Sequence, residues 1–412
     1  MHRAAWINKP VLDAARSPRS IIPARNTALE SAESEVRLLV RYSTGSDGRP
    51  VKRALVYTAA EHRIERRSID PDALRIVEHL RANGHTAYIV GGAVRDLLQG
   101  RIPKDFDIVT DAQPPRIRKI FRNSRVIGRR FRLVHVYAGR KIFEVSTYRS
   151  IADGTIGNTY GTIEEDALRR DFTMNALYFD PVDKLLVDYV GGYKDMEARI
   201  IKPVIPLSTI FKEDPVRMIR AAKYAAITGF RIPFRTGWAI RSHAALLSSA
   251  SPSRLTEEAI KILGSGRSAE IFQYLERYRL LPRILPALSI RLSGSKGRAA
   301  SFYAALAELD RHVESKADKA LAGLLAFVIR DEVTALCAEH PVGEPSEVYR
   351  MAVQASRELL APLNMPRIEL ETAVASVFIQ PESPPKPPRR RRRRRSRGRA
   401  SAAQGAGESP AP

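Results

Sequence analysis

The chain contains 412 residues, of which 44% are hydrophobic and 27% are charged. This length exceeds one ordinary domain and predicts roughly two to four folding units, and the hydrophobic share excludes a chain that is disordered throughout. The single cysteine, Cys337, excludes a disulfide framework and a zinc site built from several cysteines. No apolar run approaches the roughly 18 residues that cross a bilayer, and the N-terminus has no apolar signal region. We therefore expect a soluble, cytoplasmic protein with no membrane partner.

The charge balance is the strongest compositional feature, because 68 lysines and arginines face 45 aspartates and glutamates, a net charge of +23. Residues 381–412 hold ten basic and two acidic residues, so the rest of the chain still carries +15. A basic excess in both parts favours a polyanionic partner, most often nucleic acid. The alternative is a charge that only keeps the protein in solution.

The N-terminal half predicts a mixed α/β domain behind an extension. Residues 1–60 show weak hydrophobic periodicity, and we expect them to be mostly unstructured. Asp70 can cap a helix that begins at Pro71 and ends before Asn83-Gly84. The elements expected next are a strand at 86–90, a helix at 93–99, and strands at 106–109, 134–137 and 142–147.

The C-terminal half predicts helices only, until the composition changes at residue 381. Segments with helical spacing, separated by Pro, Gly and Ser, are expected at 211–230, 233–247, 253–263 and 268–279, with more up to residue 378. A break is expected near Gly264-Ser265-Gly266. Residues 381–412 contain a proline cluster and seven consecutive arginines, which predicts a disordered basic tail.

The segment YIVGGAVRD, residues 88–96, predicts a strand, a Gly91-Gly92 turn and a helix. Glycines at such a turn let backbone N–H groups approach a ligand, and the start of the helix favours phosphate. The spacing fits neither a Walker A loop nor a dinucleotide fingerprint. Taken alone, a Gly-Gly turn is common in proteins.

Asp105 and Asp107 follow this segment two residues apart, so on a strand their carboxylates point to the same side. Paired carboxylates repel one another unless cations lie between them, and oxygen ligands suit Mg²⁺. Two such ions about 3.5–4 Å apart catalyse in-line displacement at phosphorus. The alternative for the pair alone is a solvated strand end.

Three ordered motifs together show a specific resemblance. They are GGAVRD at 91–96 with DFD at 105–107, RRDFTMNAL at 169–177, and EDPVR at 213–217. They resemble motifs of the bacterial tRNA nucleotidyltransferase and poly(A) polymerase family, also called class II nucleotidyltransferases. The similarity covers about residues 61–230, and the helical remainder has no motif of the family.

The resemblance implies an α+β protein in which a polymerase-β-like head is followed by all-helical neck and body domains. We expect the head at residues 61–205, a neck that recognises the base at 206–265, an RNA-binding body at 266–380 and the arginine-rich tail at 381–412. The implied chemistry is template-independent transfer of nucleotides from a triphosphate such as ATP to RNA 3′ ends, with two Mg²⁺ ions.

The resemblance also implies roles for individual residues. Asp105 and Asp107 match the metal-binding, catalytic carboxylates, and Asp171 matches a carboxylate often counted with the catalytic set. Glu144 could complete the acidic cluster instead, and Asp171 could simply pair with Arg169 or Arg170. The residues that match nucleotide contacts are Gly91, Gly92, Arg95, Arg170, Asp214, Arg217, Arg220 and Lys223.

The pair Asp214 and Arg217 offers a hydrogen-bond acceptor beside a donor. Such a pair suits adenine and cytosine equally, because each presents an amino donor next to a ring-nitrogen acceptor, and it rejects guanine and uracil. One face of the expected helix contains Arg217, Arg220 and Lys223. The alternative is that this face is only an exposed polar stripe. The CCA-adding branch of the family has a third arginine where this chain has Lys223.

The run IGRRFRLVHV at 127–136 resembles the poly(A) polymerase branch rather than the CCA-adding one. We therefore expect a poly(A) polymerase that polyadenylates RNA ends of mRNA, decay intermediates or tRNA, with a CCA-adding tRNA nucleotidyltransferase as the alternative. A silent RNA-binding protein is a third possibility, against which the intact Asp105 and Asp107 argue. Further RNA contacts are expected, more weakly, from Arg129, Arg130, Arg389, Arg391, Arg393 and Arg395.

Overall fold

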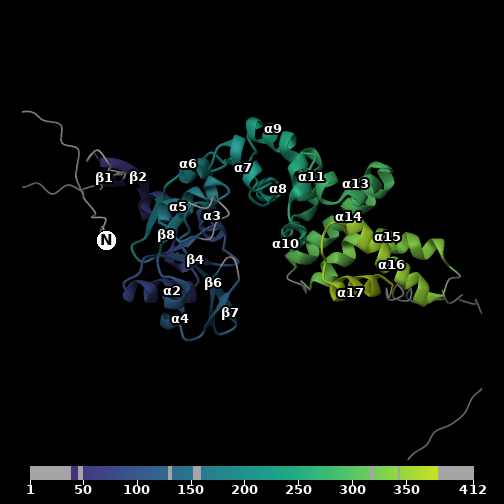
Figure 1. Ribbon diagram of the computed structural model, residues 1–412, viewed down its shortest axis with the longest axis horizontal. Helices are drawn as coiled ribbons and strands as arrows, with labels where there is room; N and C mark the ends of the chain where they lie inside the picture. Colours follow the sequence, from purple (N-terminus) through teal and green to yellow (C-terminus); the bar gives the residue numbers. More distant parts are fainter. Residues whose placement is uncertain are drawn as a thin grey trace, which may run out of the picture.

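The computed structural model describes residues 39–44, 50–128, 132–151, 159–315, 320–341 and 344–378. An α/β head is followed by a succession of helices, as Figure 1 shows. This arrangement confirms the α+β class. Several predictions concern residues outside the described ranges: most of the N-terminal extension, Arg129, Arg130, and the tail with Arg389, Arg391, Arg393 and Arg395.

The head is built on one nine-stranded sheet in the described part of the chain, with strand order β1-β2-β9-β8-β3-β4-β7-β6-β5. Neighbouring strands run antiparallel except β4 and β7, which are parallel. The strands are β1 Leu39–Thr44, β2 Pro50–Tyr57, β3 Ala87–Val90, β4 Asp107–Thr110, β5 Ser124–Ile127, β6 Leu133–Ala138, β7 Lys141–Thr147, β8 Leu177–Asp180 and β9 Leu185–Asp188.

The helices of the head begin and end where local chemistry predicts. In α2, the Asp70 carboxylate accepts a hydrogen bond from the Asp72 backbone N–H at 2.8 Å and Pro71 is the first helical residue, so the expected helix is confirmed. The head helices are α1 Ala59–His62, α2 Pro71–Ala82, α3 Gly92–Leu98, α4 Pro114–Ile120, α5 Ile163–Leu168 and α6 Gly192–Glu197.

Two strands lie within residues 1–60, where we expected mostly unstructured chain. β2 pairs with β9, with Leu55 opposite Asp188 and Tyr57 opposite Leu186, so it belongs to the head sheet. The side chains of Val56 and Tyr57 are buried. The pairing partner lies far along the chain, and periodicity within a short window therefore does not reveal it.

The helical part begins with a break that differs from the expected single helix at 211–230. α7 ends at Glu213 and α8 begins at Val216, and Asp214 between them has extended backbone angles of φ −144° and ψ 93°. Pro215 causes the break, because a proline disfavours helical geometry in the residue before it. The helices are α7 Leu207–Glu213, α8 Val216–Thr228, α9 Phe234–His243, α10 Pro252–Leu263, α11 Ser268–Arg277, α12 Leu281–Ile284, α13 Pro286–Ser293, α14 Lys296–Glu314, α15 Leu321–Glu339, α16 Pro345–Leu360 and α17 Arg367–Phe378.

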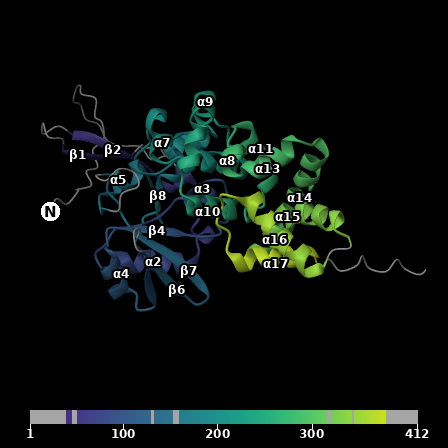
Figure 2. The ribbon, with the colours of Figure 1, turned by 45° about the vertical axis from the view of Figure 1, so that its right-hand side comes forward.

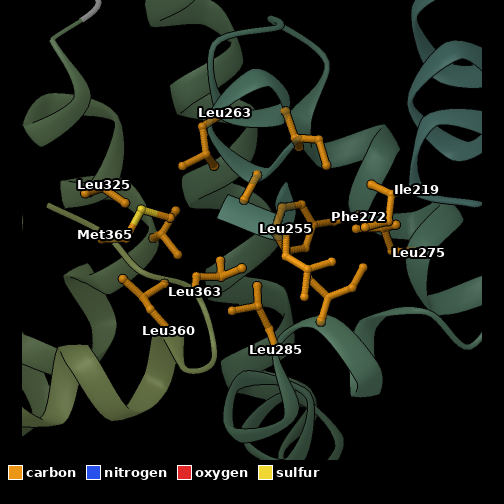
Figure 3. Close-up of a pocket in the computed structure, with 14 residues that line it drawn as sticks. Ile219, Leu255, Leu263, Phe272, Leu275, Leu285, Leu325, Leu360, Leu363 and Met365 are labelled. Atoms are coloured by element: carbon orange, nitrogen blue, oxygen red, sulfur yellow. The ribbon is translucent and has the colours of Figure 1, made fainter. Parts of the chain in front are cut away.

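The expected neck and body share one hydrophobic core. Figure 3 shows Leu255 and Phe272 meeting Leu285, Leu325 and Leu363 in a small, wholly apolar space. The helical part and the head lie beside one another in the turned view of Figure 2. Packing therefore continues across the boundary that we expected near residue 265. Among the described residues, none of the helices is both long and apolar enough to cross a bilayer.

Candidate active site

A cleft of about 540 Å³ lies between the head and the first helices of the neck. This size is typical of a small-molecule site. The head contributes the turn after β3, the start of β4 and the segment before β8, while the neck contributes α8 and α10. The lining residues are Gly91, Gly92, Asp107, Arg149, Arg169, Arg170, Asp171, Asn175, Asp214, Arg217, Arg220, Tyr224, Arg254 and Glu257.

Gly91 turns the chain from β3 into α3 at the floor of this cleft. Its φ of +70° lies in a region that side chains other than glycine rarely adopt. A Cβ atom at this position would lie 3.6 Å from Asp107 Oδ2 and 3.8 Å from Arg170 Nη1. The glycine therefore keeps the space between a carboxylate and a guanidinium open.

Asp107 is the first residue of β4 and opens into the cleft, and Asp105 precedes it as an exposed residue. β4 and β7 run parallel with Ile108 opposite Val145, which brings Glu144 to the level of Asp107 on the neighbouring strand. Burial, Glu144 and Asp105 raise the pKa of Asp107 to about 6, although Arg170 opposes the shift. Negative charge is thus concentrated at this end of the sheet.

The donor chemistry at this point fits a divalent cation. Within the described ranges, no group of three or more His, Cys, Asp or Glu side chains is already gathered closely enough to hold a metal. Asp105 and Asp107 nevertheless offer hard oxygen ligands. Burial, followed by repulsion from neighbouring carboxylates, raises the pKa of Asp107, so a cation would stabilise its charged form. Glu144 takes part in this repulsion.

Arg170 is held at the cleft wall by Asp166, a residue that the sequence analysis missed. Asp166 accepts hydrogen bonds from Arg169 Nε at 3.0 Å, Arg170 Nη2 at 3.0 Å and the Tyr178 hydroxyl at 2.8 Å. Burial opposes the charge of Arg170, but Tyr178 and Asp166 outweigh it and raise the pKa of Arg170. Asp166 precedes Arg169 and Arg170 by three and four residues at the end of α5. This helical spacing of opposite charges was the signal in the sequence that could have revealed the role of Asp166.

Asp171 is not the partner of either arginine that precedes it. It accepts hydrogen bonds from the Phe172 backbone N–H at 2.8 Å and from Asn175 Nδ2 at 3.3 Å, and Arg220 Nη1 lies 3.8 Å from its Oδ2. The ion-pair alternative for Asp171 is therefore wrong with respect to Arg169 and Arg170, which pair with Asp166 instead.

Arg95 lies behind the Gly91–Gly92 turn rather than on the cleft lining. Only 7% of it is exposed, and its guanidinium donates to Asp96 at 2.8 and 2.9 Å and to Asn175 Oδ1 at 3.1 Å. It also stacks over the ring of Tyr224, 5.4 Å from the centroid. In this structure Arg95 joins α3 to the cleft wall, and Gly92 sits directly against it.

Asp214 and Arg217 are buried side by side at the start of α8. Asp214 accepts from the Val216 backbone N–H at 3.2 Å and from Arg254 Nη2 at 2.6 Å, and Arg217 Nε lies 3.9 Å away. Arg217 Nη2 donates to the Arg169 carbonyl at 2.9 Å. Its Nη1 is buried with no partner among the described residues. The base-reading pair expected from the sequence thus lies in the cleft, joined by Arg254.

Arg220 and Lys223 are fixed by a second residue that the sequence did not reveal, Glu258 on α10. Glu258 is 2% exposed and accepts from Arg220 Nε at 2.7 Å and from Lys223 Nζ at 2.5 Å. Burial opposes its charge, but Lys223 and Arg220 lower its pKa to about 2. Burial lowers the pKa of Lys223, and Glu258 offsets part of that shift. Glu258 on α10 therefore balances part of the positive charge on the face that we expected to bind nucleotide. The ammonium group of Lys223 points to Glu258.

Two family descriptions match these parts of the chain. Residues 87–202 match the Poly A polymerase head domain, and residues 229–291 match the probable RNA and SrmB-binding site of polymerase A. The first match contains the glycine turn, the paired aspartates and the Arg169–Asp171 segment. Over these residues, the chain is similar to the tRNA nucleotidyltransferase and poly(A) polymerase family.

Relatives from both branches of this family are similar to the chain. Poly(A) polymerase I of Salmonella typhi is 42% identical over 245 residues, which are 56% of this chain and 53% of that protein. The CC-adding tRNA nucleotidyltransferase of Halalkalibacterium halodurans is 39% identical over 197 residues, 48% of this chain and 49% of that protein. The chain thus spans about half the length of these curated relatives.

A solved member of the family shares the fold. The crystal structure of the Bacillus stearothermophilus CCA-adding enzyme in complex with CTP is 26% identical, with a TM-score of 0.50, and the match covers 76% of this chain and 79% of that one. The head with its helical continuation is therefore an arrangement that the family uses.

Proposed function

We propose that this chain is a template-independent poly(A) polymerase, which transfers AMP from ATP to the 3′ end of RNA and releases pyrophosphate. The observation that supports it best is that a single cleft contains both Asp107 and the Asp214–Arg217 pair. The first belongs to the acidic end of the sheet and the second can recognise a base edge. The 42% identity to a protein named poly(A) polymerase I favours ATP as the donor.

In this proposal, Asp105 and Asp107 would hold two Mg²⁺ ions, which when bound supply charge neutralisation around the reacting phosphate. Gly91 leaves room for a phosphate beside Asp107, and Arg170 offers a positive charge on the opposite side. Asp166 keeps Arg170 in that position. The protein itself thus orients the triphosphate between a carboxylate and an arginine.

Base selection would fall to Asp214 and Arg217. Arg217 Nη1 is a buried donor without a partner in the described part of the chain, and leaving such a donor unpaired costs about 1–3 kcal/mol. Adenine N1 can accept from it, while the adenine 6-amino group can donate to Asp214. Guanine and uracil present a donor where Arg217 requires an acceptor, and both would be rejected.

Asp107→Asn tests the proposal, because it removes the charge and keeps the size of the side chain. We expect AMP transfer to fall to background while RNA binding and folding persist. Asp183→Asn is the matched control, since Asp183 is a half-exposed carboxylate paired with Arg81 on the head, away from the cleft lining. Near-normal transfer by the Asp107 variant in Mg²⁺ would refute the assignment.

The second candidate is a CCA-adding tRNA nucleotidyltransferase, favoured by the 39% identity to a CC-adding enzyme and by the fold shared with a CCA-adding enzyme. The Asp214–Arg217 pair accommodates cytosine as well as adenine, so the cleft alone does not separate the two. RNA 3′ ends of mRNA, decay intermediates or tRNA are the substrates to compare.

A further inference from the structure

Two aromatic side chains on α9 are turned out to solvent. Phe234 is 86% exposed and Trp238 is 64% exposed, and these are the most exposed aromatic side chains in the described ranges. They lie four residues apart, so they occupy the same face of the helix on successive turns. In Figures 1 and 2, α9 lies at the outer edge of the neck, above α8.

The opposite face of α9 is buried and holds the helix rigidly. Thr236 is 4% exposed and Ile240 is fully buried. A Cβ atom on Gly237 would lie only 2.9 Å from a ring carbon of Tyr278, so α9 packs closely on the end of α11. The aromatic pair is therefore presented on a fixed support, which lowers the entropy lost on binding.

Positive charge surrounds the aromatic pair. Arg231, Arg235 and Arg241 are exposed, and none of the three forms a salt bridge within the part of the chain that the structure describes. The sequence contains no aspartate or glutamate at all between Pro215 and Thr256. Unpaired arginines beside exposed aromatic rings are complementary to a polyanion that also carries flat, apolar surfaces.

We propose that Phe234 and Trp238 form a stacking platform for bases of single-stranded RNA outside the catalytic cleft, while Arg231, Arg235 and Arg241 contact its phosphates. Proteins bind single-stranded nucleic acid through this combination of aromatic stacking and a basic surface. The choice of RNA as the ligand of this platform rests on the proposed function. The platform residues lie within the matched region at 229–291.

The test measures RNA binding directly, so it does not depend on AMP transfer. Fluorescence anisotropy measures the binding of single-stranded oligo(A) to the unaltered full chain and to the double variant Phe234→Ala/Trp238→Ala. We expect the Kd to rise about tenfold or more, as the loss of one or two stacked bases predicts. The matched control is Ile290→Ala/Ile368→Ala, because these side chains are 73% and 77% exposed but lie on α13 and α17. The control should leave the Kd unchanged.

Two further readouts separate stacking from charge and from a structural effect. The chain has two tryptophans, so Trp6→Phe leaves Trp238 as the sole fluorescence reporter. RNA should quench the fluorescence of Trp238, with the same midpoint concentration as the change in anisotropy. Trp238→Phe should restore most of the affinity lost in Trp238→Ala. Arg235→Ala/Arg241→Ala should instead flatten the dependence of log Kd on log salt by about 0.7 per arginine.

Equal affinity of the aromatic double variant and its control, or no quenching of Trp238, would overturn the proposal and make a protein partner the better occupant of this face. Quenching by RNA in a protein that transfers no AMP would support the platform and refute the proposed function. Normal AMP transfer, with an unchanged KM for RNA in the aromatic double variant, would refute the platform and leave the proposed function intact.

Discussion

Glu258→Gln should destabilise the neck by an amount that depends on pH. Glu258 is almost fully buried on α10 and accepts hydrogen bonds from Arg220 and Lys223 on α8. The variant replaces its charge by a neutral amide of the same shape, so Lys223 loses its counter-charge and Arg220 keeps only Asp171, 3.8 Å away. Removing one partner of a buried ion pair destabilises proteins by about 3–5 kcal/mol.

The lowered pKa of Glu258 gives a second estimate of this loss. Its pKa falls from the ordinary 4.5 to about 2, and at about 1.4 kcal/mol per unit this corresponds to roughly 3 kcal/mol. Because the folded pKa is lower than the unfolded one, this stability is fully present above the unfolded pKa and is lost as pH falls toward 2. By pH 4, linkage predicts that about 0.8 kcal/mol of it has gone.

The assay is urea denaturation followed by circular dichroism at pH 7 and pH 4, with ionic strength held constant. Glu257→Gln is the matched control, since Glu257 is the preceding residue on α10 and its side chain is 61% exposed beside Lys261. An exposed pair of this kind contributes about 0–1 kcal/mol. Equal losses in the two variants, or a loss for Glu258→Gln that does not shrink at pH 4, would refute the reasoning.

Three further predictions concern the cleft and the tail. Gly91→Ala should lower kcat because it adds backbone strain and a Cβ atom 3.6 Å from Asp107 Oδ2. The control Gly84→Ala, at a residue with φ +83° and open space around it, should change only thermal stability. Equal kcat values for the two variants would contradict this. Arg217→Ala should relax the rejection of UTP and GTP more than it weakens triphosphate binding, which competition between nucleotides measures; unchanged ratios would mean that Arg217 only shapes α8. Deleting residues 381–412 should reduce the salt slope of RNA affinity by roughly 2–4 while AMP transfer at saturating RNA persists; parallel slopes with equal affinities would exclude an RNA contact.

Local chemistry was sufficient to predict the parts of the fold that depend on neighbouring residues. The helix begun by Asp70 and Pro71 and the strand and turn at Gly91 are each determined within a few residues. β2 could not be predicted in this way, since its partner β9 lies about 130 residues later and the pairing depends on tertiary structure.

The same division applies to the site. The motifs placed Asp107, Arg170 and the Asp214–Arg217 pair, and the structure brings all four to one cleft. Asp166 and Glu258, which orient the cationic residues, belong to no quoted motif. Glu258 reaches Arg220 from 38 residues away in sequence, so only the packing of α10 on α8 reveals its role.

The length and composition of the product on different RNA ends test the central claim most directly. Purified protein receives ATP or CTP separately, with a generic single-stranded RNA and with a tRNA that lacks its 3′ CCA. The poly(A) polymerase proposal predicts long adenylate extensions from ATP on the generic RNA and little incorporation from CTP. Incorporation of two cytidylates from CTP on the tRNA, with no extension of the generic RNA by ATP, would contradict it.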